Sequence, residues 1–363
     1  MKTFARQVHR ILAVVRLVFT VPVVAAPVFV ALVLIAGCAT PPPPEVFIDH
    51  APERLVLETV DYRLDERGRM IVPVLVNGRG PFDFILDTAS SRTLVFENVR
   101  RALEIEFIDD RTTFVHGATL SQRRPILPIE EFRIGSLTLK ANDSFSLPDP
   151  VYIETLPGGV LGMDFMRDYA IFVSILDQRI HFGRTGFQGP VRDYVSVEIT
   201  YDDFGLITHA LPFIPAAVQG HTVEALFDLG SEGTLANWPA ANVFGFAVQR
   251  ILRNQLKLEG ALSTIALDGK LDAATISVGN RVWEDQRIDI SNLPIFKTLN
   301  RAEVPTIIVS ANLLRGEDMV IDFPAARLWL RASPAQRRRA RKSQCRLVGT
   351  DRIELSCDAT RLN

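Results

Sequence analysis

The chain lacks the residue patterns of several common functional classes. Its 363 residues carry a net charge of -2, so no basic surface for a nucleic acid is expected. Its six histidines include no i, i+4 pair and no cysteine neighbour, which gives no support for a metal site. The run Gly230-Ser231-Glu232-Gly233 lacks the Gly-x-Ser-x-Gly spacing of a serine-hydrolase elbow. We therefore predict no nucleic-acid partner, no metal and no cofactor.

The first 37 residues have the composition of a targeting segment. An uncharged apolar stretch over residues 17–37 follows four basic residues, Lys2, Arg6, Arg10 and Arg16. The stretch ends at Leu34-Ile35-Ala36-Gly37-Cys38, which resembles the bacterial lipobox, where the signal is cut before a lipid-bearing cysteine. The resemblance implies lipidation of Cys38, and Ala39 after it implies an outer membrane position facing the periplasm. The alternative is a retained single-span helix, because the stretch is about long enough to cross a bilayer.

Cysteine is scarce, and its positions favour one disulfide. If Cys38 carries lipid, only Cys345 and Cys357 remain of the three cysteines. An even pair outside the cytoplasm is most simply a disulfide. The residues between them include Gly349-Thr350-Asp351 with apolar neighbours, which indicates a stapled hairpin. The basic run over residues 337–342 is interpreted as a solvated linker before it.

Residues 70–184 and 209–331 read as two copies of one unit, because the same landmarks recur in the same order. Each copy has an apolar strand that ends in an acid and a turn of small residues. Each later carries a glycine-centred tip and a closing apolar segment. The three matched pairs are Ile85-Leu86-Asp87-Thr88-Ala89-Ser90 with Leu226-Phe227-Asp228-Leu229-Gly230-Ser231, His116-Gly117-Ala118 with Glu259-Gly260-Ala261, and Val160-Leu161-Gly162 with Ile308-Val309-Ser310.

Short apolar runs broken by Gly, Pro, Asn or Asp favour strands and turns over long helices. We therefore predict an all-β protein with two β-barrel lobes and few short helices. Residues 45–69 fit a segment that shields a cleft and an extra edge strand equally well. The predicted parts are a signal peptide over 1–37, a proline-rich tether over 38–54, lobes over 55–190 and 191–332, and a basic linker with a hairpin over 333–363.

The run from Ile85 to Ser90, with Val160-Leu161-Gly162 about seventy residues later, resembles the retropepsin-like fold of aspartic proteases. The resemblance extends over about residues 55–331 and implies a pepsin-type arrangement of two lobes. Two carboxylates about 3 Å apart share a proton, so one serves as a base and the other as an acid. The candidates are Asp87 and Asp228, acting on a peptide or protein substrate in an extended conformation.

The resemblance also implies roles for the neighbouring residues. Thr88 would hold the two turns together through its hydroxyl group. Ser90 and Ser231 would each bond the outer oxygen of the aspartate in their own turn. The tips His116-Gly117-Ala118 and Glu259-Gly260-Ala261 would form flaps over the cleft, since glycine permits a tight turn.

The sequence departs from the family pattern in four places. Ala89 stands where the family has glycine, whereas the second copy keeps Gly230 there. Leu229 replaces the hydroxyl residue expected in the second turn, and Ser310 replaces the glycine of the second apolar segment. The first flap has no tyrosine. These departures weaken the second half of the site more than the first.

Three hypotheses follow from these patterns. The leading one is a lipid-anchored, monomeric aspartic endopeptidase that uses Asp87 and Asp228 and needs no metal. The second is a binding module with the same cleft, catalytically decayed, that grips a peptide or a component of the cell envelope. The third is that the first lobe completes its site with a second molecule, which the internal duplication argues against.

Overall fold

The structure of the protein is a computed structural model, and the residues it describes all fall in the unit Val46–Asn363. The described ranges are 56–108, 110–141, 144–150, 155–184, 194–202, 211–245, 249–250, 256–260, 262–314, 318–331, 345–348 and 354–357. No helix in these ranges combines the length and the apolar character needed to span a bilayer. The predicted targeting segment, Cys38 and the tether lie outside the described residues.

Two tight hairpins open the two halves of the fold, and both depend on a glycine. Asn77 and Gly78 have φ angles of 50° and 73°, and Gln219 and Gly220 have 51° and 80°. Two consecutive residues with positive φ are typical of the two-residue turn that suits the twist of paired strands. The turns join β3 (Met70–Val76) to β4 (Arg79–Leu86) and β16 (Leu211–Val218) to β17 (His221–Asp228). Strands β4 and β17 lead directly into the two acidic turns.

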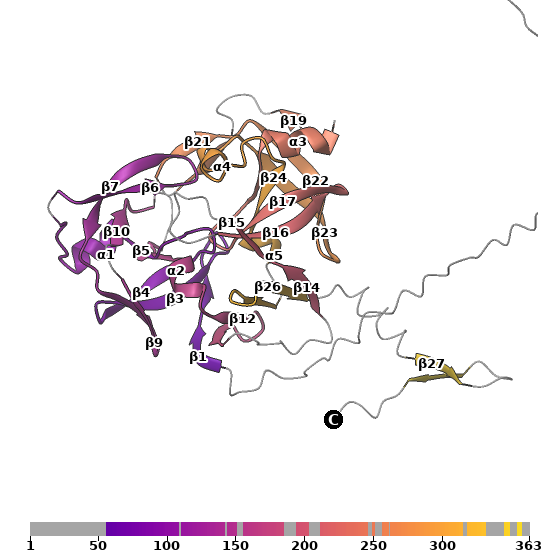
Figure 1. Ribbon diagram of the computed structural model, residues 1–363, viewed down its shortest axis with the longest axis horizontal. Coiled ribbons are helices and arrows are strands. Elements are labelled where there is room, and N and C mark those ends of the chain that lie inside the picture. The colour runs from indigo at the N-terminus through magenta and orange to yellow at the C-terminus, as the bar shows by residue number, and fades with distance from the viewer. Residues whose placement is uncertain are drawn as a thin grey trace, which may run out of the picture. The chain divides into compact units, whose positions relative to one another are not determined.

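The first half forms a ten-stranded sheet, which lies on the left of Figure 1. Strand β4 lies at its centre, between its hairpin partner β3 and the parallel strand β11. The strands are β2 (Arg63–Leu64), β3 (Met70–Val76), β4 (Arg79–Leu86), β5 (Leu94–Phe96), β6 (Thr112–His116), β7 (Ser121–Leu127), β8 (Glu131–Ile134), β9 (Leu137–Lys140), β10 (Ser144–Leu147) and β11 (Gly159–Leu161). We call this sheet with its hairpins the first lobe.

The second half forms an eight-stranded sheet with a separate two-stranded hairpin, and we call it the second lobe. Its strands are β15 (Thr200–Asp202), β16 (Leu211–Val218), β17 (His221–Asp228), β18 (Thr234–Ala236), β19 (Gln249–Arg250), β22 (Gly269–Val278), β23 (Arg281–Ile290) and β24 (Thr306–Ser310), and its hairpin is β20 (Lys257–Glu259) with β21 (Thr264–Ala266).

The two lobes pair their central strands in the same way. In the first lobe β11 is parallel to β4 and antiparallel to β5, and in the second β24 is parallel to β17 and antiparallel to β18. Strand β10 is parallel to β5 just as β23 is parallel to β18. This pairing places the end of the acid-bearing strand beside the closing apolar segment in both lobes.

A third sheet takes strands from both halves. Its six strands lie in the order β1 (Val56–Asp61), β13 (Arg179–Gly183), β12 (Ala170–Ser174), β25 (Met319–Asp322), β26 (Arg327–Arg331) and β14 (Tyr194–Glu198). The antiparallel pair β12 and β25 joins the two halves by backbone hydrogen bonds. Within the segment 45–69, the described β1 is an edge strand of this sheet, which favours the edge-strand interpretation.

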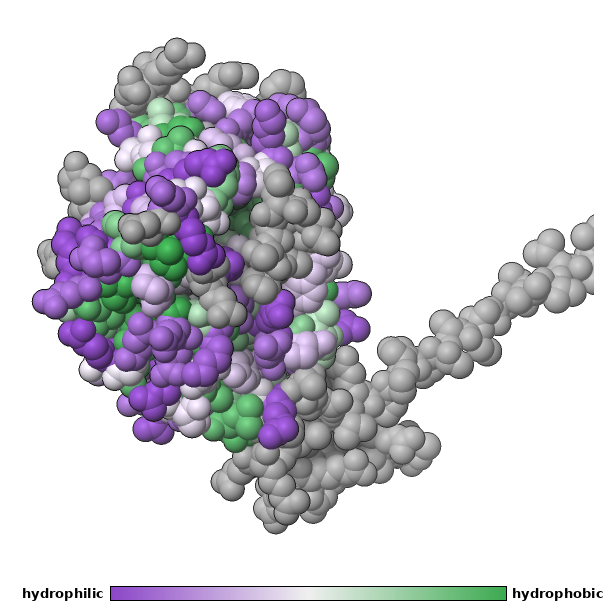
Figure 2. Space-filling view, turned by 60° about the vertical axis from the view of Figure 1, so that its left-hand side comes forward, coloured by the Kyte–Doolittle hydropathy of each residue, from purple (hydrophilic) through white to green (hydrophobic). Residues whose placement is uncertain are grey.

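The described helices are short, as predicted. They are α1 (Glu97–Ala102), α2 (Met163–Met166), α3 (Trp238–Phe244), α4 (Pro294–Thr298) and α5 (Ala311–Leu314). With the β-barrel sheets, they confirm the all-β fold class with two retropepsin-like lobes. On the face of the molecule in Figure 2, hydrophobic residues reach the surface in patches among hydrophilic ones.

Cys345 and Cys357 lie at the ends of a small hairpin of β27 (Cys345–Val348) and β28 (Glu354–Cys357). The two residues face each other in the antiparallel register. Directly opposed residues have the Cα spacing that a disulfide needs. Only the backbone of this hairpin is described, so the disulfide itself stays a prediction, as do the domain boundaries.

Candidate active site

The first acidic turn is held at the end of β4 by its own backbone. The Asp87 N–H donates to the carbonyl oxygen of Leu161 at 3.1 Å, which ties the turn to β11. The Asp87 Oδ1 atom accepts the Ala89 N–H at 2.8 Å. The turn then packs tightly against Gly162, where a Cβ atom would lie 2.5 Å from the backbone of Arg92. This glycine is therefore required by close approach.

The second acidic turn repeats this geometry. The Asp228 Oδ1 atom accepts the Gly230 N–H at 2.8 Å. The Ser231 carbonyl accepts the Ala311 N–H at 3.2 Å, just as the Ser90 carbonyl accepts the Met163 N–H at 2.8 Å. Both aspartates are thus oriented by the residue two positions on, an arrangement that Asp adopts readily in turns.

Thr88 joins the two turns through its hydroxyl group. Its Oγ1 atom donates to the carbonyl oxygen of Phe227 at 2.5 Å and accepts the N–H of Leu229 at 3.0 Å. Thr88 and Leu229 are fully buried. The hydroxyl therefore spans the peptide segment around Asp228 and fixes one turn against the other.

The two carboxyl groups meet at this junction. A Cβ atom on Gly230 would lie 2.4 Å from the carboxyl carbon of Asp87, so only glycine leaves room for that carboxyl group. The two carboxyl groups lie close enough that each affects the pKa of the other. The structure therefore brings together Asp87, Thr88, Gly230 and Asp228 from halves of the chain that are far apart in sequence.

The serine hydroxyl groups do not bond the aspartates as the sequence suggested. The Ser90 Oγ atom donates to the Arg92 carbonyl at 2.8 Å, and the Ser231 Oγ atom donates to the Gly233 carbonyl at 2.9 Å. The prediction for the hydroxyl groups is wrong, because each finds a backbone acceptor two residues on. The two serines contribute backbone N–H groups instead, which lower the pKa of the aspartate in their own turn.

The electrostatic surroundings of the two aspartates differ. Burial raises the pKa of Asp87, while the N–H groups of Ala89 and Ser90 and the charge of Arg69 oppose the rise. Burial raises the pKa of Asp228 well above its ordinary value, and the charge of Asp87 adds to the rise. Two like charges at close range cannot both ionise easily. Burial and the neighbouring charge therefore favour a proton held by the pair.

Arg69 is a component of the site that the sequence analysis missed. The antiparallel pairing of Ile71 with Ile85, continued by two residues, places Arg69 opposite Asp87. Its Nε atom donates to Asp65 Oδ2 at 2.7 Å, and the side chains of Arg69 and Asp65 are only 11% and 3% exposed. In the second lobe, Phe213 pairs with Leu226, and continuing this register by two residues places the apolar Leu211 opposite Asp228. Among the described residues, the strand register therefore places a cation opposite Asp87 and an apolar side chain opposite Asp228.

The two predicted flap tips contact each other. In the hairpin β6–β7 the Gly117 N–H closes the turn on the Leu120 carbonyl at 2.9 Å, and in β20–β21 Gly260 closes on Ser263 at 2.8 Å. Between the tips, Thr119 Oγ1 donates to the Ser263 carbonyl at 2.9 Å. The Ser263 Oγ atom in turn donates to Thr119 Oγ1 at 2.8 Å. The hairpin β6–β7 and strand β21 can be followed side by side in Figure 1.

The other predicted flap residues are held by local contacts. The His116 Nδ1 atom lies 3.0 Å from Ser121 Oγ, and the Ala118 carbonyl accepts the Ile295 N–H at 3.3 Å. Glu259 accepts a hydrogen bond from Arg67 Nη2 at 2.8 Å. Ala261 lies outside the described residues.

Arg67 forms a second connection between the lobes. Besides Glu259, its guanidinium group lies 3.5 Å from Glu232, which follows the second acidic turn. These charged side chains line an open, polar hollow of about 360 Å³ with Lys257 and Thr264. A separate hollow of about 380 Å³ lies at the opposite end of β17 from Asp228, so the aspartate pair does not lie in it.

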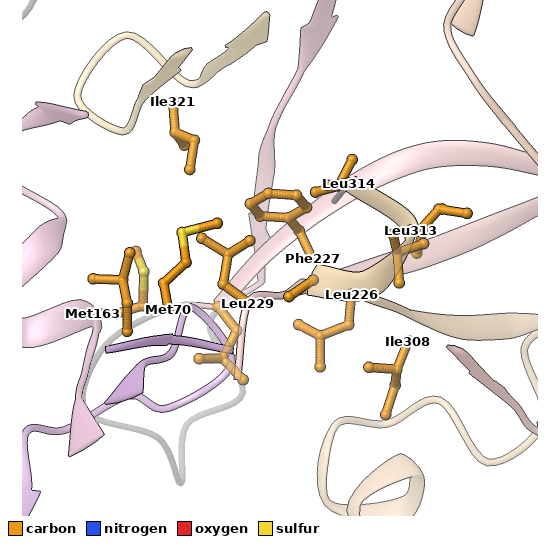
Figure 3. Packing of buried hydrophobic residues seen from close by; sticks show 14 of the residues in the cluster. Met70, Met163, Leu226, Phe227, Leu229, Ile308, Leu313, Leu314 and Ile321 are labelled. Atoms are coloured by element: carbon orange, nitrogen blue, oxygen red, sulfur yellow. The ribbon is translucent and has the colours of Figure 1, made fainter. Parts of the chain in front are cut away.

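Two of the departures from the family pattern have a clear structural consequence. The Leu229 side chain, which replaces a hydroxyl residue, lies beside Met70 and Met163 in the core that both lobes share (Figure 3). We call the contact by which Thr88 joins the two acidic turns the Thr88 interlock. It is one-sided, because Thr88 contributes hydrogen bonds whereas Leu229 contributes only apolar packing. The Ser310 Oγ atom lies 3.4 Å from Thr234 Oγ1, whereas Gly162 donates its N–H to the matching Thr93 at 3.0 Å. The threonine hydroxyl group thus contacts the backbone N–H of Gly162 in the first lobe and the side chain of Ser310 in the second.

Within the ranges that the structure describes, no group of three or more His, Cys, Asp or Glu side chains is arranged to hold a metal ion.

The Thr88 interlock predicts a stability cost that depends on the hydroxyl group rather than on size. Thr88→Val keeps the shape but leaves the Leu229 N–H and the Phe227 carbonyl without this partner. Because unpaired buried polar groups each cost about 1–3 kcal/mol, we expect a loss of about 2–4 kcal/mol in the free energy of unfolding. Urea denaturation measures it, with Thr88→Ser as the hydroxyl-retaining control. A valine variant as stable as the serine variant would refute the interlock.

The raised pKa of Asp228 predicts a stability change that depends on pH. The folded protein keeps this proton at pH values where the unfolded chain has lost it, so stability falls as pH rises through that range. Asn carries no such proton. Asp228→Asn should therefore raise the thermal midpoint more at neutral pH than at about pH 4, the pKa of an unfolded aspartate. The control is Asp83→Asn, which changes a partly exposed residue on β4. Equal shifts at both pH values would contradict the assignment.

One segment of the chain matches a known protein family. Residues 72–165 match the family described as aspartyl protease, a stretch that runs from β3 through the first acidic turn to α2. A search of curated proteins returns no match to the chain. The matched segment of the first lobe is therefore similar to aspartyl proteases.

Proposed function

We propose that the protein is an aspartic endopeptidase in which Asp87 and Asp228 act on one shared water molecule. The observation that carries the proposal is the close approach of the Asp87 and Asp228 turns at a junction fixed by Thr88. The match of residues 72–165 to aspartyl proteases supports the same chemistry.

The asymmetry of the pair assigns the two roles. Asp87, opposite Arg69, is the ionised member and accepts a proton from water as the water oxygen attacks the peptide carbonyl carbon. Asp228, with the more strongly raised pKa, donates its proton to the carbonyl oxygen. When the resulting diol collapses, the C–N bond breaks, the proton held by Asp87 passes to the leaving nitrogen, and one diol hydroxyl group returns a proton to Asp228. No cofactor is needed for this cycle.

The substrate is a peptide or protein in an extended conformation, bound between the acidic turns and the two hairpins β6–β7 and β20–β21. The hydrogen bonds between Thr119 and Ser263 close the tips on each other, so the hairpins separate to admit a chain. Closure over a bound strand then excludes water from the reacting bond.

The remaining predictions belong to the same proposal. We propose that the two lobes are copies of one unit, supported by their matched strand pairing. The protein is lipidated at Cys38, faces the periplasm from the outer membrane, acts as a monomer and carries a disulfide between Cys345 and Cys357. The opposed register of these two cysteines supports the last point.

A binding module remains the second candidate function. The methyl group of Ala89, at the position equivalent to Gly230, favours it, because this group adds bulk beside the carboxyl pair. Such a module would hold an extended peptide or an envelope component without cleaving it.

The peptidase proposal predicts that both aspartates are needed. Asp87→Asn and Asp228→Asn should each lower cleavage of a peptide library by about 10³-fold or more, since the two groups act as a unit. Liquid chromatography with mass spectrometry of the products measures it.

Asp83→Asn is the matched control, because it removes a carboxylate from the same strand and breaks only an exposed ion pair with Arg63. Cleavage that survives both active-site changes would eliminate the peptidase. Peptide binding without cleavage by the parent protein would support the binding module.

A further inference from the structure

The turn before β3 carries a buried carboxylate that takes no part in the reaction steps proposed above. Residues 65–69 connect β2 to β3, and the ends of these strands pair as Leu64 with Met70. The Asp65 side chain is only 3% exposed. A carboxylate removed from water is costly unless hydrogen bonds and a cation compensate it. The partners of Asp65 therefore indicate its role.

Asp65 divides its two oxygen atoms between the backbone and one side chain. The Oδ1 atom accepts the N–H of Arg67 at 3.0 Å and the N–H of Arg69 at 2.8 Å, which closes the turn. The Oδ2 atom accepts the Arg69 Nε–H at 2.7 Å, and Arg69 Nη2 lies 2.6 Å from the same oxygen without a hydrogen bond of its own. In the part of the chain that the structure describes, no other side chain forms a hydrogen bond or an ion pair with Arg69. Asp65 therefore sets the direction of this guanidinium group.

The guanidinium group shares a face of the sheet with Asp87. Met70 belongs to the main core, whereas Ile71 and its strand partner Ile85 belong to a separate cluster. Because side chains alternate along an extended chain, Arg69 lies on the side of Ile71. By the same alternation, Asp87 lies on the side of Ile85. In agreement, the charge of Arg69 opposes the rise in the pKa of Asp87.

We propose that Asp65 is a positioning residue for the reaction: it holds the Arg69 guanidinium group opposite Asp87 and so maintains the ionised Asp87 that accepts a proton from water. The proposal rests on the proposed function. The Arg69 side chain is only 11% exposed, so water screens its charge weakly. A change in the direction of the guanidinium group therefore changes its effect on the neighbouring carboxylate.

Asp65 also carries a charge of its own, and its two effects on Asp87 have opposite signs. As a nearby anion, Asp65 by itself raises the pKa of Asp87, whereas by holding Arg69 in place it lowers that pKa. The other titratable group that acts on Asp87 is Asp228, in the opposite turn. The sign of the change on removing the Asp65 charge thus separates a positioning role from a direct charge effect.

The test compares Asp65→Asn with the parent protein. Asparagine keeps one oxygen atom for the two backbone N–H groups but replaces the other with an NH2 group, which cannot accept the Arg69 Nε–H. The guanidinium group is then no longer held, and the lower apparent pKa of the aspartate pair should rise by about one pH unit. Carbon-13 NMR of labelled aspartate in the full-length protein measures this change without any cleavage. The acid limb of the pH profile for peptide cleavage should move by the same amount.

Asp61→Asn is the matched control, because it removes a carboxylate at the end of β1 from an exposed ion pair with Arg179. It should leave the titration and the pH profile unchanged. Asp65→Ser provides a second variant if the asparagine variant fails to fold, since a serine hydroxyl group can still accept a turn N–H. In protein that already carries Arg69→Met, Asp65→Asn should give no rise, because the group that it positions is absent.

Each other outcome decides against the proposal. A fall in the lower apparent pKa would show a direct charge effect, and an unchanged value in a less stable protein would show a purely structural role. A rise that persists with Arg69→Met would show that Asp65 does not act through Arg69. Cleavage with an unshifted pH profile would overturn the positioning role and leave the peptidase intact. The predicted rise in a protein that cleaves no peptide would support the hold of Asp65 on Arg69 and refute the peptidase.

Discussion

The hydroxyl group of Thr88 is the contact on which the candidate site depends. It bonds both the carbonyl oxygen of Phe227 and the N–H of Leu229, which are the residues on either side of Asp228. One buried side chain therefore sets the position of the opposite carboxyl group. The rest of the geometry follows from this position, because Gly230 alone leaves room for the Asp87 carboxyl group beside it.

The two halves of the site are alike in backbone and unlike in charge. The pairing of β4 with β11 matches that of β17 with β24, so two aspartates arrive in equivalent turns. Arg69 then lies opposite Asp87, whereas Leu211 lies opposite Asp228. A symmetric pair would leave the roles of base and acid undetermined. The charge of Arg69 opposes the rise in the pKa of Asp87, and the proposed chemistry uses this difference between the two carboxyl groups.

The sequence predicted the fold class and the meeting of the two acidic turns, because both depend on local patterns that recur along the chain. The Asn77-Gly78 turn and the apolar run to Leu86 are visible in sequence. The position of Arg69 opposite Asp87 was not visible in sequence, because the β3–β4 register shifts between Val74 and Val76. Without that irregularity, Gly68 would oppose Asp87. The Ser90 and Ser231 hydroxyl groups were misassigned because nearby backbone carbonyls accept their hydrogen bonds. Whether a serine hydroxyl group bonds an aspartate or a backbone carbonyl depends on their positions in the fold rather than on residue type.

The most direct test of the account is the titration of the two carboxyl groups. Carbon-13 NMR of labelled aspartate, assigned with the Asp87→Asn and Asp228→Asn variants, follows each carboxyl carbon with pH. We predict that one of the pair keeps its proton well above the ordinary aspartate range, and that replacing either residue shifts the titration of the other. Two independent titrations, both near the ordinary pKa of about 3.9, would contradict the shared-proton site.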